Sequence, residues 1–143
     1  MTRDQLFGLG GKVAAVIGAG SGIGAAVALG CARQGATVRC LDVDTGAAER
    51  TAETIVGADG AADAARLDIT DGTAVDQAFD ELVEQHRSLD VVVCTPGVNV
   101  RKRLVDYTDD EFDRVVGLNL KGSFHVLRAA GRIMMAQGSG SII

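Results

Sequence analysis

KVAAVIGAGSGIG, from Lys12 to Gly24, holds the strongest structural signal in this chain. Its first part, residues 12–17, is a short and nearly continuous apolar run with β-branched members, which predicts a buried parallel strand. After the glycines, apolar residues recur with the period of a helix, which predicts a helix lying on the sheet. The stripe of that helix comprises Ile23, Ala26, Val27, Gly30 and Cys31. The glycine-rich segment therefore forms the turn between a strand and a helix.

The glycines of this turn have a chemical consequence. Glycine adopts positive φ without strain and carries no side chain that would block a ligand. The backbone N–H groups of the turn and the positive end of the helix dipole together favour an anion. A strand, a glycine turn and a helix in this order predict a dinucleotide site. Its predicted pyrophosphate-binding residues are Gly18, Ser21, Gly22, Ile23 and Gly24.

A carboxylate follows the second predicted strand. The helix is expected to end at Gly35, and an apolar run over residues 36–41 then leads into Asp42, 24 residues after Gly18. An acid about 20 residues after the glycine turn accepts hydrogen bonds from the ribose 2′-OH of a bound dinucleotide. Asp42 would repel a 2′-phosphate, and no cation stands beside it, so we expect NAD rather than NADP. An ordinary glycine-rich turn followed by a surface aspartate is the alternative interpretation.

The spacing of Gly18, Gly22, Ile23 and Gly24 resembles the cofactor fingerprint of the short-chain dehydrogenase/reductase family. Three later segments resemble motifs of that family, in the family's order. They are Leu67-Asp68-Ile69-Thr70, Thr95-Pro96-Gly97 and Leu118-Asn119-Leu120-Lys121-Gly122. The second segment occupies the place of the family's Asn-Asn-Ala-Gly, of which only Gly97 is present, because Cys94, Thr95 and Pro96 replace the rest.

The resemblance implies roles for these residues. Asp68 and Ile69 would lie near the adenine ring, Thr95 and Gly97 would also contact the cofactor, and Asn119 would be the catalytic asparagine that holds a water in a proton relay. The family's Tyr-x-x-x-Lys pair is not found, since the one tyrosine, Tyr107, is followed at that interval by Glu111. The resemblance therefore implies the amino-terminal, cofactor-binding portion of a longer enzyme, which ends within the fifth strand.

Strand and helix patterns alternate along the whole chain. Repeated alternation predicts an α/β fold with a doubly wound parallel sheet of Rossmann type, in the strand order 3-2-1-4-5. Strands are expected at 12–17, 36–41, 64–69, 89–94 and from 141 onward. Helices are expected from Ile23 to Gly35, at 44–56, at 72–86, from a Thr108/Glu111 capping box near Asp109, and at 119–137. The glycine turn, Asp42, Asp68 and residues 94–97 would all meet at one edge of the sheet.

Length and composition limit the classes of protein. A chain of 143 residues with 47% hydrophobic and 23% charged residues predicts one domain, residues 1–143, with an aliphatic core. The net charge of −5 argues against a nucleic-acid partner, and the short basic cluster at 101–103 is interpreted as a solvated loop. No run is long enough to span a membrane, the cysteine and histidine spacing predicts no metal site, and three cysteines suggest a reducing, cytoplasmic setting.

These observations lead to one main functional hypothesis and two alternatives. The first is an NAD-dependent oxidoreductase that transfers a hydride between nicotinamide and an alcohol or carbonyl substrate, represented here by a part that binds cofactor without turnover. The second is a non-catalytic NAD-binding module or an oligomer partner, because the helix at 119–137 carries a continuous apolar face through which the family forms homo-oligomers. The third is another nucleotide-binding enzyme, such as a methyltransferase. The sequence does not choose between polyol or sugar-acid and acyl-carrier substrates.

Overall fold

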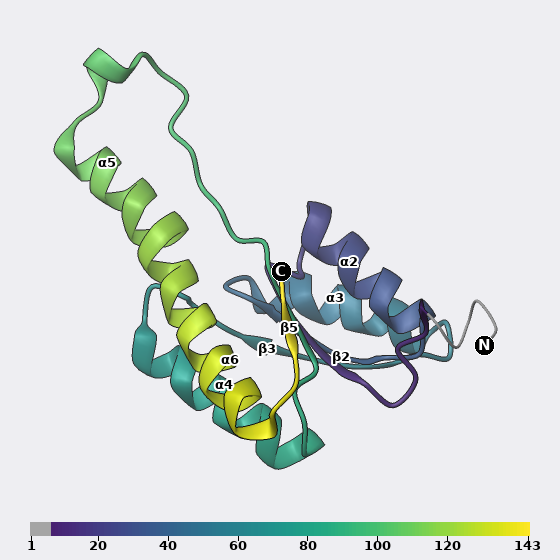
Figure 1. Ribbon diagram of the computed structural model, residues 1–143. Coiled ribbons are helices and arrows are strands. Elements are labelled where there is room, and N and C mark those ends of the chain that lie inside the picture. Colours follow the sequence, from purple (N-terminus) through teal and green to yellow (C-terminus); the bar gives the residue numbers. More distant parts are fainter. Residues whose placement is uncertain (1–6) are drawn as a thin grey trace.

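A five-stranded parallel sheet forms the centre of the computed structural model, which describes residues 7–143 (Figure 1). Residues 1–6, which the predicted domain includes, lie outside the described residues. The strands are β1 (Val13–Ile17), β2 (Thr37–Asp42), β3 (Ala61–Arg66), β4 (Val91–Cys94) and β5 (Ser141–Ile142). Their order is β3-β2-β1-β4-β5 and every neighbouring pair is parallel. The predicted strand order is confirmed.

Helices cover both faces of the sheet, as the doubly wound prediction requires. One face carries α2 (Gly22–Arg33) and α3 (Thr45–Val56), and the other carries α4 (Gly72–His86) and α6 (Ser123–Gln137) (Figure 1). Side chains of β1 alternate between the two cores because successive residues of a strand point to opposite faces. Ala14 and Val16 pack on the α2 and α3 side, whereas Ala15 and Ile17 pack on the α4 and α6 side.

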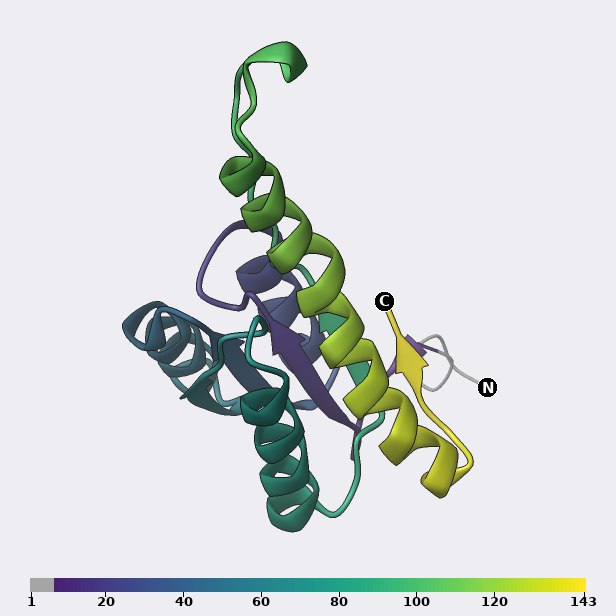
Figure 2. The same cartoon turned by 90° about the vertical axis from the view of Figure 1, so that its left-hand side faces the viewer.

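The carboxyl-terminal helix is a long rod that extends beyond the sheet. It comprises α5 (Asp109–Val116), a π-helical segment (Gly117–Gly122, η2) and α6. Figure 2 shows that the α5 end of the rod projects away from the strands. The segment after β4 runs outward to a short 3-10 helix (Leu104–Asp106, η1) and returns into α5 through the predicted Thr108/Glu111 capping box, which is present.

The third strand lies three residues earlier than predicted, at Ala61–Arg66 instead of 64–69. The prediction placed Leu67 and Ile69 in the strand because they are its most apolar residues. In the structure both are buried after the strand has ended, where they fill the core beneath α4 and α6. The alanine-rich run before them pairs with β2 along its whole length.

The buried faces of two helices also differ from the predicted stripes. In α2 the sheet-facing positions are Gly24, Val27, Ala28 and Cys31, while Ile23, Ala26 and Gly30 face solvent. In α6 the buried residues are His125, Val126, Ala129, Ala130 and Met134. The stripe expected for the helix at 119–137 comprises Leu120, Phe124, Leu127, Gly131 and Met134; Met134 is buried as expected, whereas Leu120, Phe124 and Leu127 are exposed. Small residues take part in the buried face of each helix, Gly24 and Ala28 in α2 and Ala129 and Ala130 in α6, and the apolar period does not single them out.

Gly122 offers a test of how tightly the rod is packed on the sheet. A Cβ added there would lie 2.7 Å from Cγ1 of Ile69, whereas a Cβ at Gly131 would meet nothing within 4 Å. Both residues have helical neighbours, so Gly122→Ala should destabilise by about 2 kcal/mol through overpacking, and Gly131→Ala should stabilise by up to about 1 kcal/mol. Urea unfolding measures both. Equal effects of the two substitutions would contradict this packing.

Candidate functional site: a cavity at the carboxyl edge of the sheet

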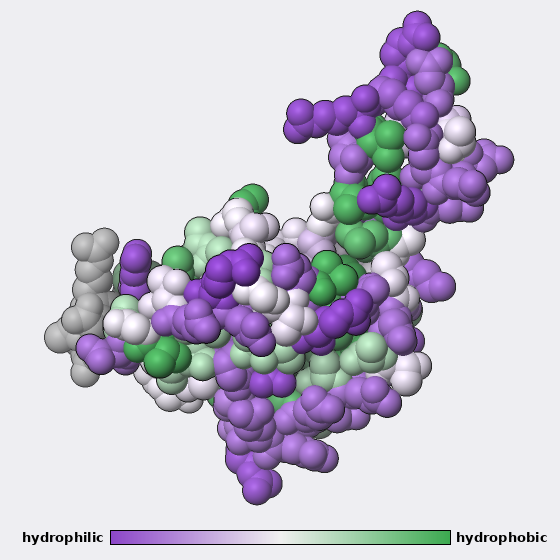
Figure 3. All heavy atoms as spheres, turned by 180° about the vertical axis from the view of Figure 1, so that it is seen from behind, coloured by the Kyte–Doolittle hydropathy of each residue, from purple (hydrophilic) through white to green (hydrophobic). Residues whose placement is uncertain are grey.

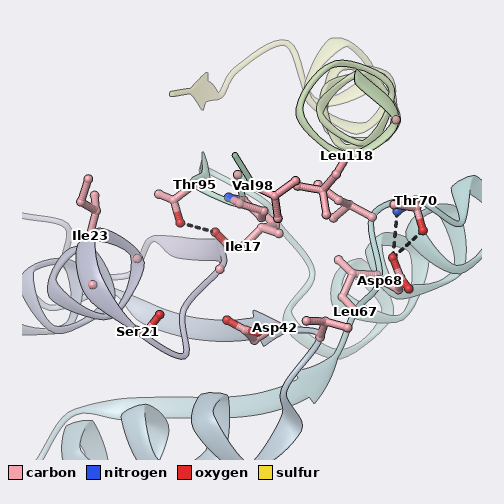
Figure 4. Close-up of a pocket in the computed structure, with 18 of the residues that line it drawn as sticks. Ile17, Ser21, Ile23, Asp42, Leu67, Asp68, Thr70, Thr95, Val98 and Leu118 are labelled. Atoms are coloured by element: carbon pink, nitrogen blue, oxygen red, sulfur yellow. Dashed lines mark hydrogen bonds between the residues drawn. The ribbon is translucent and has the colours of Figure 1, made fainter. Parts of the chain in front are cut away.

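A cavity of about 720 Å³ opens where β1, β2 and β4 end, and Figure 4 shows it in close-up. Its walls come from the glycine turn, the ends of β2 and β4, the loop after β3 and the helical rod. Leu118 points into it from the rod, opposite Leu67 and Asp42. The volume falls within the range of about 300–1,000 Å³ that is common for small-molecule sites.

The glycine turn brings the start of α2 directly onto the end of β1. Gly18 has φ of +82°, a conformation that favours glycine. A Cβ on Gly24 would overlap the carbonyl oxygen of Gly18, so the helix and the turn touch through bare backbone. Thr95 closes the packing from β4, because its hydroxyl donates a hydrogen bond to the Ile17 carbonyl oxygen at 2.8 Å.

The first turn of α2 presents backbone N–H groups to the cavity. Ser21 is the N-cap residue, and its side chain makes no capping hydrogen bond. The first N–H groups of a helix have no partner within the helix. Ser21, Gly22 and Ile23 line the cavity, and N–H groups at the positive end of a helix favour an anion.

Asp42 stands at the end of β2 beside this turn. Its Oδ2 accepts a hydrogen bond from the Gly20 N–H at 2.9 Å, and its Oδ1 accepts one from the Asp44 N–H at 3.0 Å. A carboxylate has about four lone-pair sites. Each oxygen of Asp42 therefore keeps capacity for one further donor, and the residue lines the cavity.

Asp68 lies in the loop after β3, where it makes a local turn with Thr70. Its Oδ1 accepts hydrogen bonds from the hydroxyl of Thr70 at 2.7 Å and from the N–H of Thr70 at 3.0 Å (Figure 4). These two bonds, the hydroxyl first, lower the pKa of the Asp68 carboxyl below its usual value. The carboxylate is thus kept charged and fixed in direction at the cavity wall.

Asn119 lies in the π-helical segment, and its side chain does not line the cavity. Its Oδ1 accepts from the Val98 N–H at 2.8 Å, and its Nδ2 donates to the Val98 carbonyl oxygen at 2.9 Å. The amide is therefore used to clamp the segment after Gly97 to the rod. Tyr107 is also turned away from the cavity, since its hydroxyl donates to the Val100 carbonyl oxygen.

The structure brings all ten residues predicted to bind cofactor to the wall of one cavity: Gly18, Ser21, Gly22, Ile23, Gly24, Asp42, Asp68, Ile69, Thr95 and Gly97. The prediction did not include Leu118, Arg114 and Lys121, which line the cavity from the rod. Leu118 and Lys121 belong to the 118–122 segment that carries Asn119, so the sequence could have identified them. No sequence pattern distinguishes Arg114, because it is one of several charged residues on an exposed helix.

Two further features are absent from the described residues. Within 7–143, no group of three or more His, Cys, Asp or Glu side chains is placed to hold a metal ion. No helix in that part of the chain has the length and apolar character to cross a membrane.

The two bonds from Thr70 to Asp68 predict a pH-dependent effect. The folded-state pKa of Asp68 is lowered, so its contribution to stability is present above the unfolded value of about 3.9 and is lost as the pH falls through the folded pKa. Thr70→Val should raise the pKa of Asp68 in a carbon-13 NMR titration. It should also lower the urea midpoint of unfolding at pH 6. The difference in midpoint between wild type and Thr70→Val should shrink below about pH 4.

Thr54→Val is the matched control, because the exposed Thr54 hydroxyl donates only to a carbonyl of its own helix. It should leave the pKa of Asp68 unchanged. An Asp68 titration that is identical in wild type and Thr70→Val would contradict the assignment.

The sequence matches the family model for short chain dehydrogenases over residues 12–143. Among curated relatives, a short-chain dehydrogenase/reductase of Armillaria gallica is 38% identical over 140 residues, covering 93% of this chain and 52% of its own. D-threitol dehydrogenase of Mycolicibacterium smegmatis is 34% identical over 143 residues, covering 100% of this chain and 55% of its own. The chain thus spans about half the length of these relatives.

Solved structures agree with the sequence matches. A short-chain dehydrogenase/reductase from Mycobacterium marinum superposes with a TM-score of 0.95 at 34% identity, covering 99% of this chain and 58% of that structure. NAD+-bound xylitol dehydrogenase superposes with a TM-score of 0.91 at 33% identity, covering 94% and 52%. With the family model matched over nearly the whole chain, and with the fold and glycine turn described above, this chain belongs to the short-chain dehydrogenase/reductase family.

Proposed function

We propose that residues 1–143 form one NAD-binding domain of a short-chain oxidoreductase, which transfers a hydride between nicotinamide and an alcohol or carbonyl substrate. The observation that carries the proposal is the Asp42 carboxylate, held by two backbone N–H groups at the wall of a cavity that begins at an uncapped helix. The name of one structural neighbour, NAD+-bound xylitol dehydrogenase, supports the same cofactor.

The cavity fits the diphosphate and the adenosine of such a cofactor. The turn at Gly18 and Gly24 has no space for side chains, so a diphosphate would meet main-chain N–H groups of Gly22 and Ile23 directly. The free lone pairs of Asp42 suit the two hydroxyls of a ribose, whereas a 2′-phosphate would face a fixed negative charge. This contrast supports NAD over NADP. Asp68 and Ile69, with Leu118 opposite, would border the adenine.

The other end of the cavity would receive the nicotinamide. Thr95, Gly97 and Val98 form its wall, and Asn119 fixes that wall through its two bonds to Val98. When bound, the cofactor supplies or accepts the hydride. Asn119, predicted as the catalytic residue, holds the Gly97–Val98 backbone in place, and we propose this positioning as its contribution.

We propose that the 143 residues bind cofactor without turnover. Proton transfer to the substrate oxygen needs a positioned acid or base. The one tyrosine, Tyr107, donates to a backbone carbonyl in the projecting loop, and Glu111 rather than a lysine follows at the interval of the family's pair. In the complete enzyme the substrate would be a small alcohol or ketone. Relatives named for D-threitol and sorbitol favour a polyol.

Cytoplasmic placement is part of the same proposal. Cys31, Cys40 and Cys94 are all free thiols in the structure. Burial raises the pKa of Cys40 to about 11, which makes that thiol unreactive. Three unpaired cysteines suit a reducing compartment.

Calorimetric titration of the chain tests the cofactor. Wild type should bind NAD at least about tenfold more tightly than NADP. Asp42→Asn should lose most of that preference, because the amide places a donor where a backbone N–H or a ribose hydroxyl now donates, and removes the charge that repels a 2′-phosphate.

Mixing wild type with NAD and D-threitol or sorbitol should yield no NADH.

Asp59→Asn is the matched control. Asp59 is exposed, does not line the cavity and has the left-handed conformation that asparagine tolerates. This variant should keep the wild-type preference. Absence of NAD binding to the wild-type chain would refute the proposed function.

The exposed face of the helical rod supports a second candidate function, association with another copy of the chain. Leu120 and Phe124 are 68% and 54% exposed, and Leu127 and Met135 continue the stripe. Figure 3, seen from behind, shows a mostly hydrophilic projecting end with only scattered apolar side chains. Contiguous apolar surface such as the stripe on the rod marks interaction sites, so we propose a homo-oligomer formed through residues 119–137.

Phe124→Glu should convert an oligomer into monomer in sedimentation velocity at micromolar concentration, because a charge would be buried in the interface. Val56→Glu is the control, since Val56 is equally exposed, at 54%, on the opposite face of the sheet. Identical sedimentation of Phe124→Glu and wild type would exclude this interface.

A further inference from the structure

The glycine turn is hydrogen-bonded to β2 and α3 at successive residues. The Ala19 N–H donates to the Leu41 carbonyl oxygen at 3.1 Å, and the Gly20 N–H donates to Oδ2 of Asp42 at 2.9 Å. The buried hydroxyl of Thr51, in α3, donates to the Ala19 carbonyl oxygen at 2.8 Å. The turn, the end of β2 and the first part of α3 are therefore one packed unit, with the Asp42 carboxylate inside it.

Steric crowding, and not backbone conformation, favours glycine at residue 20. It is not among the glycines with positive φ, so its backbone conformation does not require glycine. A Cβ there would lie 2.6 Å from the Cβ of Ala47 and 2.8 Å from Oδ2 of Asp42. The Ala47 methyl belongs to the first turn of α3 and cannot move without the helix. Of the three atoms nearest to that Cβ, two belong to the Asp42 carboxylate, which is the end of a side chain and can be displaced when residue 20 shifts away from the Ala47 methyl.

The carboxylate is held from two sides. Gly20 donates to one oxygen and Asp44 donates to the other, while the Asp44 side chain itself caps α3 by accepting from the Ala47 N–H at 3.0 Å. A carboxylate fixed in this way presents its remaining lone pairs in one direction. It matches a pair of neighbouring hydroxyls and cannot swing away from a competing phosphate.

We propose that Gly20 and Ala47 are positioning residues that set the preference of this site for NAD over NADP by holding Asp42 in place. The inference rests on the proposed NAD site and deepens it. Neither residue lines the cavity. Their effect on the cofactor passes through Asp42, so enlarging residue 20 should disturb NAD binding, and reducing residue 47 should restore it.

Calorimetric titration of the 143-residue chain with NAD and with NADP tests the proposal in four variants: Gly20→Ala, Ala47→Gly, the double variant and Gly30→Ala. Gly20→Ala should weaken NAD binding about tenfold, the worth of one charge-assisted hydrogen bond, and change NADP binding less than about twofold. The double variant should return NAD binding to within about threefold of wild type. Gly30→Ala, where a Cβ meets nothing within 4 Å, should change neither affinity.

If Gly20 had only a structural role, Gly20→Ala would weaken the binding of NAD and of NADP alike, and Ala47→Gly would not restore it. That result overturns the proposal. A Gly20→Ala chain that keeps the wild-type preference for NAD also overturns it. If Gly20→Ala does not fold, the double variant decides. Recovery of folding with the NAD preference supports the proposal, and folding without it refutes the proposal. A wild-type chain that binds no NAD overturns the proposed function as well, and the wild-type titration alone shows this.

Discussion

Gly24 has no room for a side chain beneath the carbonyl oxygen of Gly18, and the carboxyl edge of the sheet is arranged around that approach. It brings the start of α2 onto the end of β1 and so directs the free N–H groups of the helix into the cavity. Thr95 then packs against both glycines and ties β4 to the same point. The start of α2, the Asp42 carboxylate and the far wall of the cavity are thereby fixed relative to one backbone contact.

Much of this arrangement was predictable from local chemistry. The glycine turn between an apolar strand and a helix, the acid after the second strand and the Thr108/Glu111 capping box each depend on a few neighbouring residues. Parallel connectivity then brings the strand ends to one edge. This is why all ten predicted cofactor residues line one cavity, although they come from four separate segments.

What could not be predicted depends on packing across the sheet. The alanines of β3 have little strand propensity, so the apolar Leu67 and Ile69 drew the prediction three residues along the chain. In α2 and α6 small residues such as Ala28 and Ala129 contribute to the buried face, while the larger Ile23 and Phe124 are left exposed. The partner of the Asn119 amide, the Val98 backbone, is 21 residues away in sequence, and no local pattern reports such a bond.

The π-helical segment between α5 and α6 determines which side of the rod faces the protein at each end. It contains Leu118, which points into the cavity, and it precedes Val126, which is buried in the core. A π turn closes its hydrogen bond over one residue more than an α turn, so this segment turns by less per residue than the roughly 100° of a straight α-helix. The angle between Leu118 and Val126 about the rod axis therefore depends on the number of residues within 117–122, and a changed length there would disturb the alignment of cavity and core more than a changed side chain.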